Sequence, residues 1–235
     1  MMDRRRALMM ADGEILPPVP SGYITDGLVF FLDGKQLATA TKWVDIRGGK
    51  VFDLTDCSKG TNGIVFNGST SYGKCNGAIT NDWENETIEV VFDGITNLKT
   101  RTIFNQPFMN NKVGIGLRFG DNGAQIRLAT AQDGVRRDFY YANITQTKNR
   151  LSCSAAYTGN GLCVLNRSQQ TSHVESSYGK NESGSTIIGA RTTSGETFMN
   201  KYTGTIIAVR IYNRKLSVVE MQANQANDLI YYNLS

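Results

Sequence analysis

Apolar and polar residues alternate along most of the chain, and the clearest alternation runs through residues 205–212. Ile207, Val209 and Ile211 share one face of this stretch, and the even-numbered residues share the other. A period of two residues is typical of a strand, because successive side chains point to opposite sides of a sheet. The pattern therefore predicts a strand that packs one face on a core.

A short helix is expected directly after this strand. Ser217 is followed three residues later by Glu220, which is the spacing of a capping box. In that motif the two side chains satisfy the first free amides of a helix. Helical periodicity is almost absent before Ser217, so a short helix is predicted at the carboxyl end of the sandwich.

The rest of the chain has the character of short strands joined by tight turns. Gly occurs 24 times, and Asn-Gly or Asp-Gly pairs recur throughout. We expect an all-β fold in which residues 21–235 form one antiparallel β-sandwich of two sheets with jelly-roll connections. The predicted strands span 27–32, 50–54, 63–67, 72–75, 87–92, 100–105, 113–119, 124–130, 135–141, 150–157, 161–165, 185–188 and 204–212.

Several motifs carry a resemblance to a known family. "GLVFFLDGK", "GIVFNGSTSYGKC" and "YTGTIIAVRIYNRKLSVVE" follow one another along the chain. In this order they resemble laminin-G-like domains of the concanavalin A-like lectin and glucanase superfamily, over about residues 23–225. The resemblance implies a sandwich whose closing strand leads into a short helix. The arginine- and methionine-rich start also resembles laminin-G-like proteins of gut-bacterial phages and prophages.

Residues 1–20 stand apart from the predicted sandwich. Three arginines and four methionines precede Pro17, Pro18 and Pro20, and the prolines impose a stiff, extended spacer. A mobile tail is one interpretation. The other is an arm that docks the protein onto a virion or another assembly, or onto further copies of itself. The residues assigned to this assembly arm are Arg4, Arg5, Arg6, Leu8, Met9 and Met10.

Charge and hydropathy exclude some classes of function. The net charge of +4 is spread along the chain, so no nucleic-acid partner is expected. No apolar run is long enough to cross a bilayer, and no apolar segment of a signal peptide follows the first arginines. We therefore expect neither membrane insertion nor a signal peptide, and we predict folding in a cytoplasm before a virion or extracellular location.

The four cysteines are expected to be reduced thiols. They are Cys57, Cys75, Cys153 and Cys163, too scattered for a disulfide framework or a zinc site. If the Thr158–Gly161 segment forms a tight turn, Cys153 lies opposite Asn166 rather than Cys163 and cannot be bridged.

Catalysis is not expected from the sequence. Glycosidases generally need two carboxylates, which the glucanase branch carries as E-x-D-x(x)-E on one strand. In "WENETIEVVF", Glu84 and Glu86 share a face, Glu89 falls on the other, and the central Asp is missing. His173 is assigned to a Ser- and Gln-rich loop and is interpreted as a surface residue. A glycoside hydrolase is kept only as the least favoured alternative.

No cofactor is expected either. Relatives in the family bind calcium through acidic residues after the F-N-G turn and in the closing strand. Here those places hold Ser69, Thr70 and Ser71, and Ile207 and Ala208. Calcium held by loop carbonyls with Asp45 or Asp56 remains a weak alternative, because the ion needs six to eight oxygen ligands.

A polar sheet face is the best candidate for ligand binding. A turn at 120–123 would place Arg118 opposite Gln125, and a turn at Asp133-Gly134 would place Arg127 opposite Tyr140. An aromatic ring among planar donors and a carboxylate suits a sugar, although any solvated sheet face also alternates in this way. Trp43 is expected in the core. The ligand-binding candidates are Arg118, Gln125, Arg127, Asp138, Tyr140 and, on a separate loop, Trp83.

These observations favour a non-enzymatic recognition module that binds a cell-surface carbohydrate as part of a phage or prophage particle. The alternative is a purely structural virion protein, such as a fibre, tail or capsid decoration, anchored by its arm.

Overall fold

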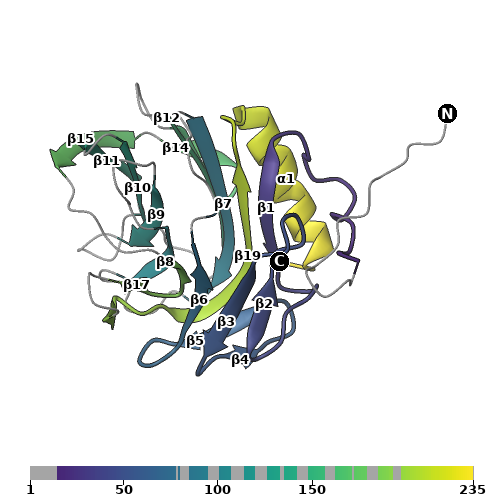
Figure 1. Ribbon diagram of the computed structural model, residues 1–235. Coiled ribbons are helices and arrows are strands. Elements are labelled where there is room, and N and C mark those ends of the chain that lie inside the picture. The colour runs from purple at the N-terminus through teal and green to yellow at the C-terminus, as the bar shows by residue number, and fades with distance from the viewer. Residues whose placement is uncertain are drawn as a thin grey trace.

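The computed structural model describes residues 15–77, 79, 85–94, 101–106, 114–119, 126–132, 135–141, 148–156, 162–170, 172–178, 185–192 and 197–234. These residues form two large antiparallel sheets, a two-stranded hairpin and one helix (Figure 1). The all-β sandwich with a short C-terminal helix is therefore confirmed. The arm residues that precede position 15 lie outside the described residues, as do Gln125 and Trp83.

The first sheet has eight strands, and β19 lies at its centre. Its order is β14 (Ser168–Gln170), β13 (Leu162–Leu165), β12 (Lys148–Ala156), β7 (Asn85–Asp93), β19 (Thr203–Tyr212), β5 (Ile64–Asn67) and β4 (Ser58–Lys59), with β1 (Leu28–Asp33) also paired to β19.

The second sheet has nine strands, with a two-stranded hairpin beside it. Its order is β15 (Ser172–Tyr178), β11 (Val135–Tyr141), β10 (Ile126–Gln132), β9 (Gly114–Phe119), β8 (Thr102–Asn105), β16 (Ser185–Ile188), β6 (Tyr72–Asn76), β3 (Val51–Thr55) and β2 (Lys42–Val44). The hairpin consists of β17 (Arg191–Thr192) and β18 (Phe198–Met199).

The main core lies between the two sheets. Every second residue of the inner strands contributes to it, which is why alternation was visible in the sequence. Phe30, Phe92 and Phe104 are fully buried there. Trp43 is also fully buried, as predicted, and its indole nitrogen donates to the Asp33 carbonyl at 3.0 Å.

A second core covers the outer face of the eight-stranded sheet. Helix α1 (Val218–Tyr231) lies along β19 and β1 on that side (Figure 1). The expectation that β19 buries only one face is therefore wrong, because the helix covers the other. A register shift between Ile206 and Ala208 also moves Ile207 from its predicted inner face to the helix side.

The capping box predicted for α1 is present. The Ser217 hydroxyl accepts from the Glu220 amide at 3.3 Å, and the Glu220 carboxylate accepts from the Ser217 amide at 2.8 Å. Arg214 also donates to Glu220, at 2.6 Å. Those contacts, with the hydrogen bond from Arg214 the largest cause, lower the pKa of Glu220 to about 2.

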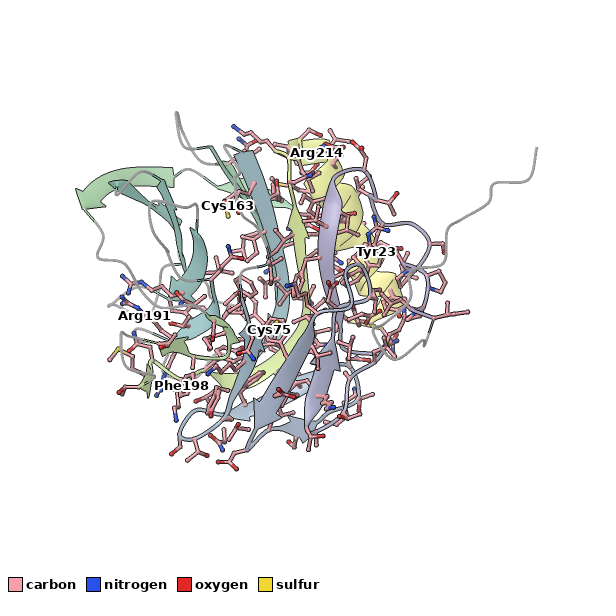
Figure 2. All side chains as sticks on the ribbon, viewed as in Figure 1. Tyr23, Cys75, Cys163, Arg191, Phe198 and Arg214 are labelled. Atoms are coloured by element: carbon pink, nitrogen blue, oxygen red, sulfur yellow. The ribbon has the colours of Figure 1, made fainter. Side chains whose placement is uncertain are left out.

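A buried ionic network joins the helix to the sheet. Arg210 on β19 donates to Glu89 on β7 at 2.8 Å and makes two bonds to Asp228 on α1 at 2.6 and 2.7 Å. All three side chains are almost fully buried. Tyr23 lies beside the helix in Figure 2, and its hydroxyl donates to Asp228 at 2.8 Å. The segment before β1 is therefore held against the domain.

The register of β12 and β13 corrects the interpretation of the cysteines. Cys153 is directly opposite Cys163, not Asn166. Asn166 and Arg167 both have positive φ and form the turn into β14, so Asn166 is not in the ladder. The observed register also sets Leu151 opposite Leu165, which keeps apolar positions on the core side. The distance argument against a Cys153–Cys163 bridge is therefore wrong.

Candidate functional site

The nine-stranded sheet brings several predicted ligand-binding positions into one row. Arg118 on β9 is opposite Arg127 on β10, Arg127 is opposite Tyr140 on β11, and Tyr140 is opposite His173 on β15. The neighbours of Arg118 along its strand, Leu117 and Phe119, are fully buried in the main core. By alternation, the row therefore lies on the side of the nine-stranded sheet that faces away from the main core. We call this side the outer face.

One of the two predicted registers is confirmed. Arg127 is opposite Tyr140 and Ala129 is opposite Asp138, as a two-residue turn at Asp133-Gly134 requires. The other is wrong, because Arg118 pairs with Arg127 rather than with Gln125. Residues 120–125 connect the two strands, so the loop is longer than the predicted turn. A register shift of two residues keeps every residue on the face that was predicted for it.

A second row runs beside the first. It contains Asn105 on β8, Gly116, Ala129, Asp138 and Glu175 on β15. Strand β15 was missed by sequence reasoning, because "SHVESSY" has a single apolar residue inside it and gives no clear alternation. The structure thus adds His173 and Glu175 to the candidate site, and it corrects the assignment of His173 to a loop.

Two buried polar side chains border the outer face at β8. Thr102, opposite Arg118, is 2% exposed, and Asn105, opposite Gly116, is 6% exposed. Among the described residues, neither the Thr102 hydroxyl nor the Asn105 amide nitrogen has a hydrogen-bond partner. A buried polar group without a partner costs about 1–3 kcal/mol, so each of these groups calls for an explanation.

The hairpin of β17 and β18 forms one edge of this region. β17 packs beside β8 and β16, and Figure 2 shows Arg191 and Phe198 at the same corner of the molecule. The Phe198 ring stacks on Tyr72 with centroids 3.8 Å apart and an angle of 14°. The Lys201 amine lies 5.9 Å from the centre of the Tyr72 ring. Sequence reasoning missed this aromatic pair, because Phe198 lies in no recognisable strand pattern.

Arg101 links the segment between the hairpin and β19 to the loop of the F-N-G-S motif. One of its terminal nitrogens donates to the Lys201 carbonyl at 2.7 Å and to the Gly68 carbonyl at 3.3 Å. In that loop the Asn67 side-chain oxygen accepts from the amides of Ser69 and Thr70, at 2.8 and 2.9 Å. The loop therefore satisfies its own polar groups.

Asp45, one of the two carboxylates of the weak calcium alternative, already has hydrogen-bond partners on the backbone. Asp45 accepts from the amides of Phe31, Arg47 and Gly48 at 2.8 Å each, so its oxygens serve the backbone. Its pKa is raised by burial, against the lowering effect of these bonds. No group of three or more His, Cys, Asp or Glu side chains that could hold a metal occurs in the described part of the chain.

The acidic residues of the "WENETIEVVF" segment have different surroundings. Glu89 is paired with Arg210 under the helix. Glu86 is 2% exposed on the same face of β7 as the core residue Ile88, and neither of its oxygens has a partner among the described residues. Burial raises its pKa to about 8. Glu84 lies outside the described residues.

Comparisons with known proteins bear on the fold. No protein-family model matches the chain, and no curated protein matches it. Solved structures do. Trypanosoma rangeli sialidase in complex with sialic acid has a TM-score of 0.58 and 18% identity, covering 92% of this chain and 36% of the sialidase. The receptor binding domain of a botulinum neurotoxin C/D mosaic serotype has a TM-score of 0.57 and 14% identity, covering 88% and 52%.

These similarities establish a β-sandwich of the kind found in those proteins. The chain spans about a third of the sialidase and half of the toxin domain, and the identities are low. The laminin-G resemblance is carried by the sequence motifs alone, because no family model supports it. Among the described residues, no helix is long and apolar enough to cross a membrane.

The prediction that the protein is not an enzyme is contradicted. The similar structures include sialidases, which are enzymes, so this fold does not exclude a glycosidase. The sequence argument considered only carboxylates within one strand. The register places Asp138 directly opposite Glu175, so two carboxylates can also meet across neighbouring strands.

Proposed function

We propose that the domain binds a carbohydrate on the outer face of the nine-stranded sheet. The observation that carries this proposal is the row of Arg118, Arg127, Tyr140 and His173 across four neighbouring strands. Planar donors beside an aromatic residue suit a pyranose, whose hydroxyls need hydrogen bonds and whose apolar face packs on a ring.

The small residues of the second row support the same proposal. Gly116 and Ala129 occupy the adjacent positions with almost no side-chain volume, so a ring can approach the sheet there.

The solved structures agree with this proposal without establishing it. One is a sialidase with sialic acid bound, and another is the receptor binding domain of a toxin. A laminin-G-like relationship, inferred from the motifs, also favours recognition. A place in a phage or prophage particle, with docking through residues 1–20, rests on the sequence resemblance and on the composition of the arm.

A glycan array with purified protein tests the proposal. We expect the wild type to bind a subset of glycans, and Tyr140→Ala, Arg127→Ala and Trp83→Ala to weaken binding about tenfold or more, as for central contact residues. Arg167→Ala is the matched control, because Arg167 is exposed on the β13–β14 turn of the other sheet. No binding by the folded wild type would end the proposal.

The same samples should be assayed for sugar release, since the fold does not exclude hydrolysis. Release that disappears in both Asp138→Asn and Glu175→Gln would assign an enzymatic role to the opposed carboxylates. Binding without release would leave recognition as the function of this face.

A further inference from the structure

The solvent-exposed side of α1 carries an apolar strip. Val219 is 73% exposed and Ile230 is 81% exposed, near opposite ends of the helix. Ala223 and Ala226 lie between them, and the spacing of four, three and four residues sets all four side chains on one face. We call these four residues the helix strip. The buried residues of α1 lie on the opposite face, and they are Met221, Asn224, Gln225 and Asp228.

The helix strip carries no charge. The charged residues of α1 are Glu220 and Asp228. Glu220 pairs with Arg214 at the start of the helix, and Asp228 is buried against Arg210. The exposed face of a surface helix normally carries charged side chains. A neutral strip with two large, well-exposed apolar residues therefore indicates a contact surface rather than a face adapted to water.

Polar groups border the helix strip on both sides. The Gln222 side chain donates to the main-chain carbonyl of Arg167 at 2.9 Å on one side. The Asn227 side chain donates to the main-chain carbonyl of Ser21 at 3.2 Å on the other. Arg167 thus lies at the border and not within the strip. An apolar centre with a polar rim is the usual arrangement of a protein–protein interface.

The helix strip is symmetric about the middle of α1. Val219 and Ile230 are equally far from the midpoint of the helix, and so are Ala223 and Ala226. Two antiparallel copies would therefore set Val219 of each copy against Ile230 of the other, as a two-fold axis requires. The alanines would meet at the centre, where small side chains let two helices approach closely. A neutral strip also meets its own copy without electrostatic repulsion.

We propose that the helix strip is the contact between two copies of this chain, packed with their α1 helices antiparallel. Helices of 14 residues touch over about 21 Å, which buries less than the ~800 Å² per partner of a stable dimer. The dimer is therefore weak and forms as the concentration rises. The outer faces of both nine-stranded sheets remain free in it, because α1 covers the other sheet (Figure 1).

Sedimentation velocity of the full chain over a range of concentrations tests the proposal. We expect the wild type to pass from monomer to dimer, and Ile230→Lys and Val219→Glu each to weaken association about tenfold or more. Lys and Glu are better helix formers than Ile and Val, so both variants should fold, which circular dichroism checks. Thr55→Lys is the matched control, because it adds a charge at an exposed position of β3, and it should associate like the wild type.

A double variant tests the antiparallel arrangement. With Val219→Glu and Ile230→Lys in the same chain, an antiparallel pair sets opposite charges against each other at both ends. A parallel pair would instead set like charges together. The double variant should therefore associate more tightly than either single variant, and added salt should reduce this advantage.

Three results would overturn the proposal. A wild type that stays monomeric at every concentration would leave the helix strip to residues 1–14 or to another protein. Self-association that survives both single substitutions but is lost on deletion of residues 1–14 would assign the contact to the arm. A double variant that associates more weakly than both single variants would exclude the antiparallel pair.

Discussion

At the scale of single residues, β7 shows how position decides the state of a carboxylate. Glu86 and Glu89 are three residues apart on one strand and therefore face opposite sides of the sheet. Glu89 accepts hydrogen bonds from Arg210 and Asn224 under the helix. Glu86 points into the main core, where burial alone raises its pKa to about 8. The first carboxylate is part of the scaffold, and the second weakens it.

Replacing Glu86 by Gln should stabilise the protein at neutral and alkaline pH. The pKa of Glu86 is about 8 in the folded chain and about 4.5 when exposed. Folding therefore favours the protonated form, and stability falls as the pH rises from about 4.5 to 8, by ~1.4 kcal/mol per unit. At pH 7 we expect Glu86→Gln to raise the free energy of unfolding by up to about 3 kcal/mol, and at pH 4 to change it little or not at all. Urea unfolding at several pH values measures this.

Glu220→Gln is the matched control, with the opposite sign. The pKa of Glu220 is lowered to about 2 by the hydrogen bond from Arg214 and by the helix cap. The Glu220 carboxylate therefore stabilises the fold above about pH 4.5, and this contribution is lost as the pH falls toward 2. The substitution should lower stability at pH 7. If Glu86→Gln kept the pH profile of the wild type, the Glu86 carboxyl would be ionised and solvated in the native state.

At the scale of elements, turn length decides which registers could be predicted. The Asp133-Gly134 turn leaves one pairing for β10 and β11, and that pairing was predicted correctly. The connections 120–125 and 157–161 are longer, and the strand registers predicted across them were wrong by two and three residues, respectively. Half of the candidate site, on β15 and the hairpin, has no apolar alternation and could not be found in this way. The burial of both faces of β19 depends on the packing of α1 against the sheet. The helix itself was predicted from its capping box, but no local pattern reveals which face of the sheet it covers.

The segment that leads into the first strand carries a prediction of its own. Leu16 is only 5% exposed, and Val19 packs against the second core, so part of the proline-rich spacer belongs to the folded domain. Deleting residues 1–14 should leave the melting temperature unchanged. Deleting residues 1–20 should cost about 1.5–3 kcal/mol for the lost burial of Leu16, a decrease of roughly 4–10 °C. Differential scanning calorimetry on both truncations measures the difference.

Leu16→Ala in the full chain should reproduce most of the larger loss. The shorter deletion then becomes the clean test of the docking arm, because it removes Arg4 to Met10 without touching the described core. Equal melting temperatures for the two truncations would show that Leu16 contributes nothing to the fold in solution.

At the scale of the whole molecule, the fold is closed by its last strand. β19 pairs with β1, β5 and β7, so residues near the carboxyl end join strands that begin as early as Leu28. Its side chains also contribute to both cores, and Arg210 anchors α1. Pairings so distant in sequence must overcome a large loss of chain entropy before they are stabilised by contacts. The eight-stranded sheet cannot therefore form around a gap at its centre.

A chain that ends at residue 202 should consequently fail to fold, although it retains the strands of the outer face. It lacks β19 and α1, which leaves β1, β5 and β7 each with an edge that has lost its partner strand. We expect loss of the β-sheet signal in circular dichroism and rapid cleavage by protease. The control is the chain without residues 1–14, which should resist protease as well as the wild type does. Adding a separate peptide of residues 203–234 should restore protection only if β19 inserts between β7 and β5 with its native register. A truncated chain that stayed protease-resistant and kept its sheet signal would mean that the nine-stranded sheet is stable alone, and the proposed binding face would then be independent of the closing strand.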